Sequence, residues 1–217
     1  MENLAQKAEI PPQEQEKQAA KREFIELIKL VVVFLLVFWV VKSFVIEGYE
    51  VQGESMSPTL EDRDRILVFK LPRELSRISL FSGFAPFDDK DIIVFKEDNA
   101  KRLVKRVIAH NPRRNGNTVD AQHLEDETFN PDAMKVEFDH GVVRINDWQI
   151  DESAYLPEEA KKTRDNSVCM LRPGEYYVLG DNRPVSKDSR SFNAITDDRI
   201  IGRALLRFWP LSRFKLL

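Results

Sequence analysis

The chain of 217 residues contains a single cysteine, Cys169, which has no CxxC partner. It can form no internal disulfide, so both a disulfide framework and a paired-cysteine zinc ribbon are excluded. Histidine is equally scarce, because only His110, His123 and His140 occur and they show no HExxH spacing. Nothing in the sequence calls for a metal ion, and we expect neither a metal site nor a cofactor.

Neither sign of charge dominates, because 33 Lys and Arg face 36 Asp and Glu, which gives a formal net charge of −3. No basic block interleaved with aromatic residues occurs, so nucleic acid is not an expected partner. Hydrophobic residues make up 42% of the chain, which is enough for a packed core. The length suits one domain of ordinary size with appendages.

Residues 1–23 are rich in Gln, Glu, Lys and Ala, and they predict a solvated, disordered tail. Residues 24–46, FIELIKLVVVFLLVFWVVKSFVI, are strongly apolar, although the uninterrupted part spans only residues 30–41. That part alone also suits a buried helix or the apolar region of a signal peptide. Apolar residues occupy every side of the helix, and Lys29 and Lys42 lie near its ends, where they can reach headgroups. We therefore predict one transmembrane helix over 24–46, long enough to cross about 30 Å.

The distribution of basic residues predicts the orientation of this helix. Four Lys or Arg precede it, whereas none occurs between Lys42 and Arg63. The positive-inside rule then places the N-terminus in the cytoplasm and the remainder outside the cell membrane. A cleaved signal peptide is the alternative, but KSFVIEGYE offers no pair of small residues for cleavage. We favour an uncleaved, single-pass anchor.

Residues 47–217 are mainly β in pattern. Residues 134–150 predict a hairpin with its turn at Asp139-His140-Gly141, and a second bend at Asn146-Asp147. The stretch 111–133 is polar, and we expect a polar, partly β insertion at about 111–170. The predicted fold is thus an irregular antiparallel β-sheet domain that follows one N-terminal transmembrane helix. Other short segments rich in β-branched residues predict strands at 65–71, 91–97, 102–110, 174–180 and 199–209.

Within the predicted strand 102–110, Lys105 lies on the same face as Leu103 and Val107. Burial of a lysine disfavours its charged form and lowers its pKa, and a neutral lysine is a general base. The alternative is that Lys105 lies on an edge strand and reaches solvent along its own stem.

Two further segments combine polar residues in unusual density. In GESMSPTL, residues 53–60, Ser57-Pro58 has the pattern of a helix N-cap, which would leave Ser55 as a polar loop residue. The loop GDNRPVSKDSRSFNAI, residues 180–195, lies between two apolar strands. It is either a solvated turn or a scaffold that holds a site rigid. Its ionisable residues include Asp181, Arg183, Asp188 and Arg190.

The segments SMSPTL, RLVKRVIA and GDNRPVSKDSR occur in this order after the single apolar span. In this the chain resembles the type I signal peptidases, membrane-anchored serine proteases with a Ser/Lys dyad. The resemblance runs from the span to the C-terminus. It implies a signal-peptidase-type β domain outside the membrane. It also implies an enzyme that removes N-terminal signal peptides from secreted precursors, with those precursors and the lipid bilayer as partners.

The resemblance also implies a role for individual residues. Ser55 matches the nucleophile, and Lys105 matches the general base. Ser186 matches the serine that hydrogen-bonds the lysine amine. The ion pairs that brace the site would be Asp181 with Arg106, and Asp188 with Arg190.

The oxyanion hole is less completely assigned. The backbone N–H of Ser55 would be one donor. Some members carry a serine two residues before the nucleophile, where this chain has Gly53, so the second donor stays open. Gly53 and Met56 are the candidates for substrate or oxyanion contacts.

The chain departs from the family pattern at three turns. Asp89-Lys90-Asp91 stands where an RGD-like turn is usual, and AHNPRRNG follows the lysine strand in place of a GLPGD-like turn. Asn193 replaces a glycine, although asparagine also tolerates a left-handed backbone. None of these positions belongs to the expected dyad.

A loop near residue 80 carries Phe81, Phe84 and Phe87. These rings either close over the core or dip into the membrane interface.

The sequence leaves three alternative functions: an inactive binding protein on the same fold, a self-cleaving soluble Ser/Lys peptidase, and a Ser/His/Asp hydrolase that uses His110. His110 is five positions beyond Lys105, so on a strand it would face away from the lysine.

Overall fold

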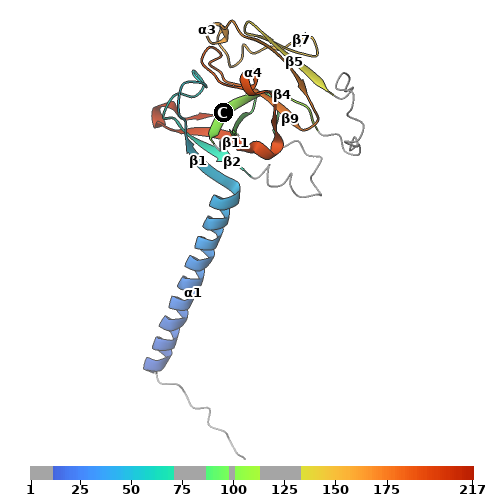
Figure 1. Ribbon diagram of the computed structural model, residues 1–217. Coiled ribbons are helices and arrows are strands. Elements are labelled where there is room, and N and C mark those ends of the chain that lie inside the picture. Colours follow the sequence, from blue (N-terminus) through green and yellow to red (C-terminus); the bar gives the residue numbers. More distant parts are fainter. Residues whose placement is uncertain (1–11, 71–86, 98–100, 113–132) are drawn as a thin grey trace, which may run out of the picture. The chain divides into compact units, whose positions relative to one another are not determined.

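The computed structural model describes residues 12–70, 87–97, 101–112 and 133–217 (Figure 1). The chain divides into two compact units, Met1–Ser43 and Phe44–Leu217. Among the described residues, the first unit contains one long helix, and the second contains the strands.

The helix α1 spans Pro12–Val40 and is followed by a short π-helix, η1, at Val41–Val45. The prediction of a disordered tail is therefore wrong from Pro12 onward, because Gln, Glu, Lys and Ala are good helix formers and proline is favoured at a first helical position. The predicted helix 24–46 also ends too late, because Ile46 already pairs with Phe69 as the start of a strand. Along α1, the apolar side chains from Phe24 to Val40 are exposed. None of the helices in the described ranges combines the length and apolarity needed to cross a membrane.

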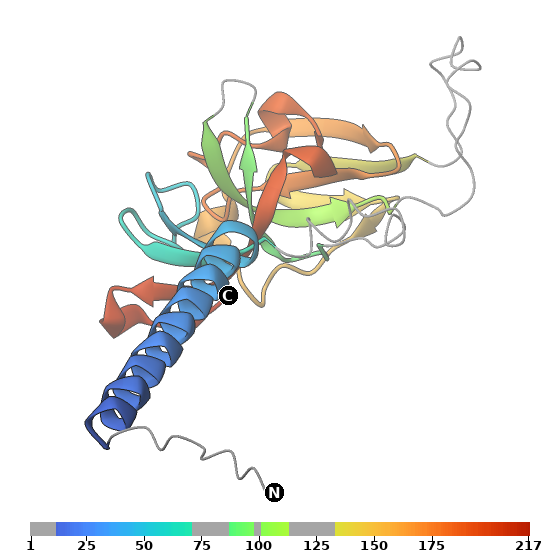
Figure 2. The same ribbon diagram turned by 90° about the horizontal axis from the view of Figure 1, so that it is seen from below.

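An eight-stranded antiparallel sheet forms most of the second unit, in the order β1-β2-β11-β3-β4-β9-β10, with β12 paired to the outer part of β11 (Figure 1, Figure 2). This confirms the mainly β prediction, including the strands expected at five places. The strand β1 was not predicted, because only Ile46 belongs to the apolar run before it and the remaining residues, EGYE, include two glutamates and a glycine, which are depleted in strands. The bounds are β1 Ile46–Glu50, β2 Arg65–Phe69, β3 Ile92–Lys96, β4 Arg102–His110, β9 Glu175–Leu179, β10 Ile195–Thr196, β11 Ile200–Trp209 and β12 Lys215–Leu216.

The strand β3 is buried on both faces and separates two core clusters. Ile92 and Val94 pack with Met56 and Leu60 on one face, whereas Ile93 and Phe95 pack on the other. The first cluster lies under the segment that carries Ser55. Burial of these side chains, worth about 1.5–3 kcal/mol each, therefore anchors the backbone around the serine.

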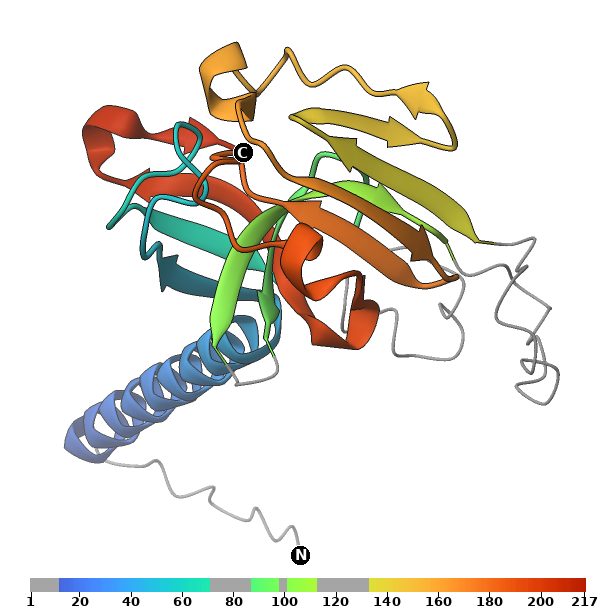
Figure 3. The ribbon, with the colours of Figure 1, turned by 45° about the horizontal axis from the view of Figure 1, so that its top comes forward.

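The insertion forms a second, four-stranded sheet in the order β7-β6-β5-β8 (Figure 3). Both predicted bends are confirmed as two-residue turns with positive φ, at His140-Gly141 and at Asn146-Asp147. A Cβ at Gly141 would lie 2.4 Å from the Lys161 carbonyl oxygen, so this turn packs against the helix α3. The elements are β5 Met134–Asp139, β6 Val142–Ile145, β7 Trp148–Gln149, α3 Glu158–Lys161 and β8 Asn166–Leu171.

Phe87 is fully buried and packs edge-on against Tyr176. The membrane-interface hypothesis is therefore wrong for Phe87, whereas Phe81 and Phe84 lie outside the described residues. The described residues also form three further short helices: α4 Ser189–Phe192, η4 Asp197–Arg199 and η5 Leu211–Arg213.

Candidate active site

The segment around Ser55 is a series of turns and not a helix, so the N-cap interpretation of Ser57-Pro58 is wrong. The Leu60 N–H donates to the Met56 carbonyl at 2.8 Å, and the Ser57–Pro58 peptide is cis. Met56 and Leu60 are fully buried in the core. These two side chains anchor the turn to the core. Ser55, directly before Met56, is half-buried.

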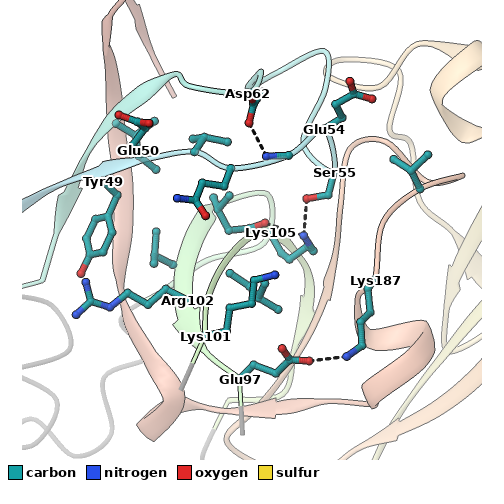
Figure 4. A pocket seen from close by; sticks show the side chains of 18 residues that line it. Tyr49, Glu50, Glu54, Ser55, Asp62, Glu97, Lys101, Arg102, Lys105 and Lys187 are labelled. Atoms are coloured by element: carbon teal, nitrogen blue, oxygen red, sulfur yellow. Dashed lines mark hydrogen bonds and ion pairs between the residues drawn. The ribbon is translucent and has the colours of Figure 1, made fainter. Parts of the chain in front are cut away.

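Lys105, from β4, points its amine at Ser55 (Figure 4). Its Nζ donates to Ser55 Oγ at 2.7 Å and to the Val104 carbonyl at 3.0 Å. The residue is only 2% exposed, so the alternative of a solvent-reaching edge lysine is wrong.

The electrostatics of this amine suit a base. Burial lowers the pKa of Lys105 from 10.5 to about 8, against the opposing influence of the Asp188 and Asp181 carboxylates. A lysine with this pKa is partly neutral near pH 7 and can accept a proton from a hydroxyl.

The structure pairs the carboxylates and guanidinium groups that the resemblance connects. Arg106 Nε donates to Asp181 Oδ1 at 2.9 Å, and Arg190 Nε donates to Asp188 Oδ1 at 2.8 Å. Both aspartates are fully buried. A buried carboxylate needs such partners, so these pairs fix the loop that carries both aspartates.

Ser186 differs from the expectation. Its Oγ is buried and has no hydrogen-bond partner among the described residues. The Lys105 amine instead uses Ser55 and the Val104 carbonyl. The expected bond between Ser186 and Lys105 is therefore not formed in this structure.

Gly53 and Met56 also differ from their expected roles. The Gly53 N–H donates to Asp62 Oδ1 at 2.7 Å, so it is not free to act as the second oxyanion donor. Gly53 has a φ of +84°, which favours glycine. The Met56 side chain is 0% exposed, because it packs in the core, so it is not presented to a substrate.

His110, at the end of β4, is engaged elsewhere. Its Nδ1 lies 2.8 Å from Asp89 Oδ1, and its ring stacks on Tyr176. The hydrogen bond with Asp89 raises the pKa of His110. In the turn that supplies Asp89, Lys90 has a φ of 77°.

Asn193, which stands where the family pattern has a glycine, has a φ of 62°. The asparagine therefore adopts the positive φ expected of it.

A groove of about 1140 Å³ leads to Ser55 and Lys105 (Figure 4). One wall is formed by residues 49–55 and the other by residues 101–105. Among the described strands, β1 pairs only with β2, and β4 pairs with β9 only from Arg106 onward. Both walls therefore present backbone edges that no described strand covers.

Sequence reasoning overlooked Asn182. Its backbone N–H donates to the Ser55 carbonyl at 3.0 Å, and its side-chain Nδ2 donates to the Glu54 carbonyl at 3.1 Å. In the sequence, its place in GDNR indicated only that asparagine is a typical turn residue. Asn182 in fact ties the loop to the segment that carries the serine.

A serine hydroxyl hydrogen-bonded to a buried amine, on a β scaffold beside an open groove, is the arrangement of serine hydrolases that use lysine in place of histidine. The family described as signal peptidase, peptidase S26, matches residues 24–209, and the chain belongs to this family. Its enzyme class is that of signal peptidase I, a serine peptidase.

Two relatives agree with this membership in sequence. The chain is 31% identical to signal peptidase IB of Staphylococcus aureus over 205 residues, which covers 90% of this chain and 94% of the relative. It is 32% identical to signal peptidase I of Bacillus caldolyticus over 183 residues, with 80% and 85% covered. A solved signal peptidase I of Enterococcus faecalis aligns with 54% of this chain and 95% of its own, at 23% identity and a TM-score of 0.36.

Proposed function

We propose that this protein removes N-terminal signal peptides from secreted precursors, with Ser55 as nucleophile and Lys105 as general base. The observation that carries the proposal is the 2.7 Å hydrogen bond between a buried amine and the serine hydroxyl. A neutral lysine at this distance can take the hydroxyl proton as the oxygen attacks a carbonyl carbon.

The reaction then follows the two-step course of a covalent hydrolase. Ser55 Oγ attacks the scissile carbonyl while Lys105 takes its proton, and the Ser55 N–H stabilises the developing oxyanion. The protonated lysine gives its proton to the leaving amine. The same lysine then activates the water that hydrolyses the acyl-enzyme. Ser186, whose buried hydroxyl has no hydrogen-bond partner in the described part of the chain, is the candidate to orient the amine when the Ser55 oxygen is acylated.

The substrate chain would add as a strand in the groove. The edge of β1 that faces away from β2 and the edge of β4 before Arg106, which no described strand covers, support this mode, because an extended peptide can donate to and accept from both. Shallow pockets in such a groove would favour small residues, such as alanine, beside the scissile bond.

We further propose that the apolar part of α1, from residue 24 to residue 40, holds the protein in the cell membrane, with the N-terminus in the cytoplasm and the peptidase unit outside. The exposed apolar side chains of α1 support this anchoring, because a helix that is apolar all round is suited to a lipid environment. Anchoring would bring the enzyme to precursors that are themselves tethered in the bilayer.

Cleavage of a purified precursor in detergent tests the catalytic proposal. Ser55→Ala and Lys105→Ala should each abolish cleavage, because one removes the attacking oxygen and the other removes the base. His110→Ala is the matched control from the same strand and should cleave at close to the wild-type rate. Wild-type cleavage by folded Lys105→Ala would refute the lysine mechanism.

A further inference from the structure

The loop 180–183 holds the backbone at Ser55, the proposed nucleophile, by direct contacts. Asn182 donates to the carbonyls of Ser55 and Glu54. Gly180 is in still closer contact, because a Cβ there would lie 2.2 Å from Ser186 Oγ and 2.4 Å from the Ser55 carbonyl oxygen. Any movement of this loop would therefore move both Ser55 and Ser186.

Arg183 holds this loop in place, and it is 0% exposed. Its Nε donates to the Gly180 carbonyl at 3.0 Å, and its backbone N–H donates to the Ala160 carbonyl at 3.1 Å. Its own carbonyl accepts from Arg190 Nη2 at 2.7 Å. The guanidinium group thus clamps the turn that contacts Ser55.

The charge of Arg183 is balanced by Glu152, which comes from the inserted segment between β7 and α3. Arg183 Nη2 and Nη1 donate to the two carboxylate oxygens of Glu152 at 2.5 and 3.2 Å. Glu152 is only 3% exposed, so both charges are desolvated. A two-point pair of this kind fixes orientation as well as distance.

Tyr155 connects the Glu152–Arg183 pair to the Arg106–Asp181 pair. Its hydroxyl donates to Glu152 Oε1 at 2.6 Å, and its ring lies 4.2 Å from the Arg106 guanidinium carbon. Burial, and then the neighbouring Glu152 carboxylate, raise the pKa of Tyr155, so the hydroxyl stays protonated. Arg106 in turn holds Asp181 next to Gly180.

We propose that Glu152 and Tyr155 are positioning residues for cleavage: they hold the loop 180–183, and through it Ser55, in the reactive arrangement. Neither side chain lines the groove, so they act through Arg183 and Arg106 and not on the substrate. The inserted sheet therefore contributes to the reaction by supplying this brace. The inference rests on the proposed function, because it assigns roles around Ser55.

The test measures kcat and KM of the full chain in detergent for Glu152→Gln and Tyr155→Phe. Glu152→Gln keeps the shape but removes the charge opposite Arg183, and kcat should fall about ten- to a hundredfold, as expected for a misplaced reacting group. Tyr155→Phe keeps the ring over Arg106 and both ion pairs, and its kcat should fall about three- to tenfold. KM should change less than twofold in both variants, roughly, because the groove walls are untouched.

Two control variants separate positioning from stability. Glu159→Gln removes an exposed carboxylate from the same segment and should leave kcat unchanged. Tyr177→Phe removes a different buried hydroxyl, which bonds Ser167 at 3.0 Å, and should lower the melting temperature but not kcat. Each rate is measured well below the melting temperature of that variant.

Unchanged kcat in folded Glu152→Gln and Tyr155→Phe would overturn the inference. If Glu152→Gln does not fold, Tyr155→Phe decides alone, and an unchanged kcat overturns it. A lower kcat in Tyr177→Phe equal to that in Tyr155→Phe would also overturn it, since loss of stability would then explain both. Failure of the proposed function is distinguishable, because Ser55→Ala would then still cleave the precursor.

Discussion

At the scale of single residues, the proposed chemistry depends on how little water reaches the amine of Lys105. Lys105 would be fully charged at neutral pH if it were exposed, and a charged amine cannot accept a proton. On the strand β4, Lys105 is only 2% exposed, and its amine lies beside the hydroxyl of Ser55. The buried carboxylates Asp181 and Asp188 work in the opposite direction, because they favour the charged form. The balance leaves the amine able to change its protonation state near physiological pH.

This balance predicts the pH dependence of cleavage. If the neutral amine is the active form, as proposed, then kcat/KM should rise with pH below 8 and level off above it, because burial lowers the pKa of Lys105 to about 8. On the acid side the rise should approach about tenfold per pH unit, as for a single ionisation. Initial rates between pH 5 and pH 10 on a peptide without ionisable groups near the scissile bond would measure the profile. A rate that is already constant from pH 5.5 upward would contradict the role of Lys105.

At the scale of elements, the site is a junction of three segments distant in sequence. The turn 53–60, the strand β4 and the loop 180–190 meet at Ser55. The turn is anchored by buried Met56, and the loop is anchored by buried ion pairs. The Arg106–Asp181 pair joins the loop to β4, and Met56 packs against residues of other strands, so the reactive geometry depends on how elements pack.

Gly180→Ala tests this junction. The new methyl group would lie 2.4 Å from the Ser55 carbonyl oxygen and 2.2 Å from Ser186 Oγ, so backbone must move. A displacement of about 1 Å at the nucleophile should lower kcat about a hundredfold.

Gly48→Ala, in β1, is the matched control for this change. A Cβ at Gly48 would meet only the Phe208 ring, at 3.9 Å, so folding and activity should persist. Comparison of kcat and melting temperature for the two variants checks the prediction. Equal activities would show that the loop adapts without moving Ser55.

At the scale of the whole molecule, the chain separates a helical unit from the unit that holds the groove. Met1–Ser43 contains α1, whereas the groove and all the site residues belong to Phe44–Leu217. Cleavage chemistry and delivery to the substrate are therefore predicted to be separable.

Removal of residues 1–43 should leave cleavage of a short soluble peptide within about threefold of the full chain, because no groove residue is lost. Cleavage of a precursor inserted in lipid vesicles should fall about tenfold or more, because the effective concentration from anchoring is lost. The same truncation with Ser55→Ala provides the background rate. Equal rates of the two forms on the vesicle-bound precursor would contradict the anchoring proposal.

The local features of this fold could be predicted from the sequence because neighbouring residues produce them. Alternation of β-branched residues predicted five strands of the larger sheet, and His140-Gly141 and Asn146-Asp147 were recognised because their turns need residues that tolerate positive φ. The apolar neighbours of Lys105 suggested burial but left a solvent-reaching edge lysine open, and only the packed sheet decided between the two. The strand β1 and the helix before residue 24 were missed, because the composition of each was typical of another state.

The contacts between distant segments could be decided only by the tertiary structure. The unpartnered Ser186, the engaged N–H of Gly53 and the pairing of Glu152 with Arg183 carry no signal in sequence spacing. Each depends on which polar groups are left facing one another once the apolar side chains have packed. Burial makes every such group require a partner, but only the packing of the two sheets determines which partner is within reach.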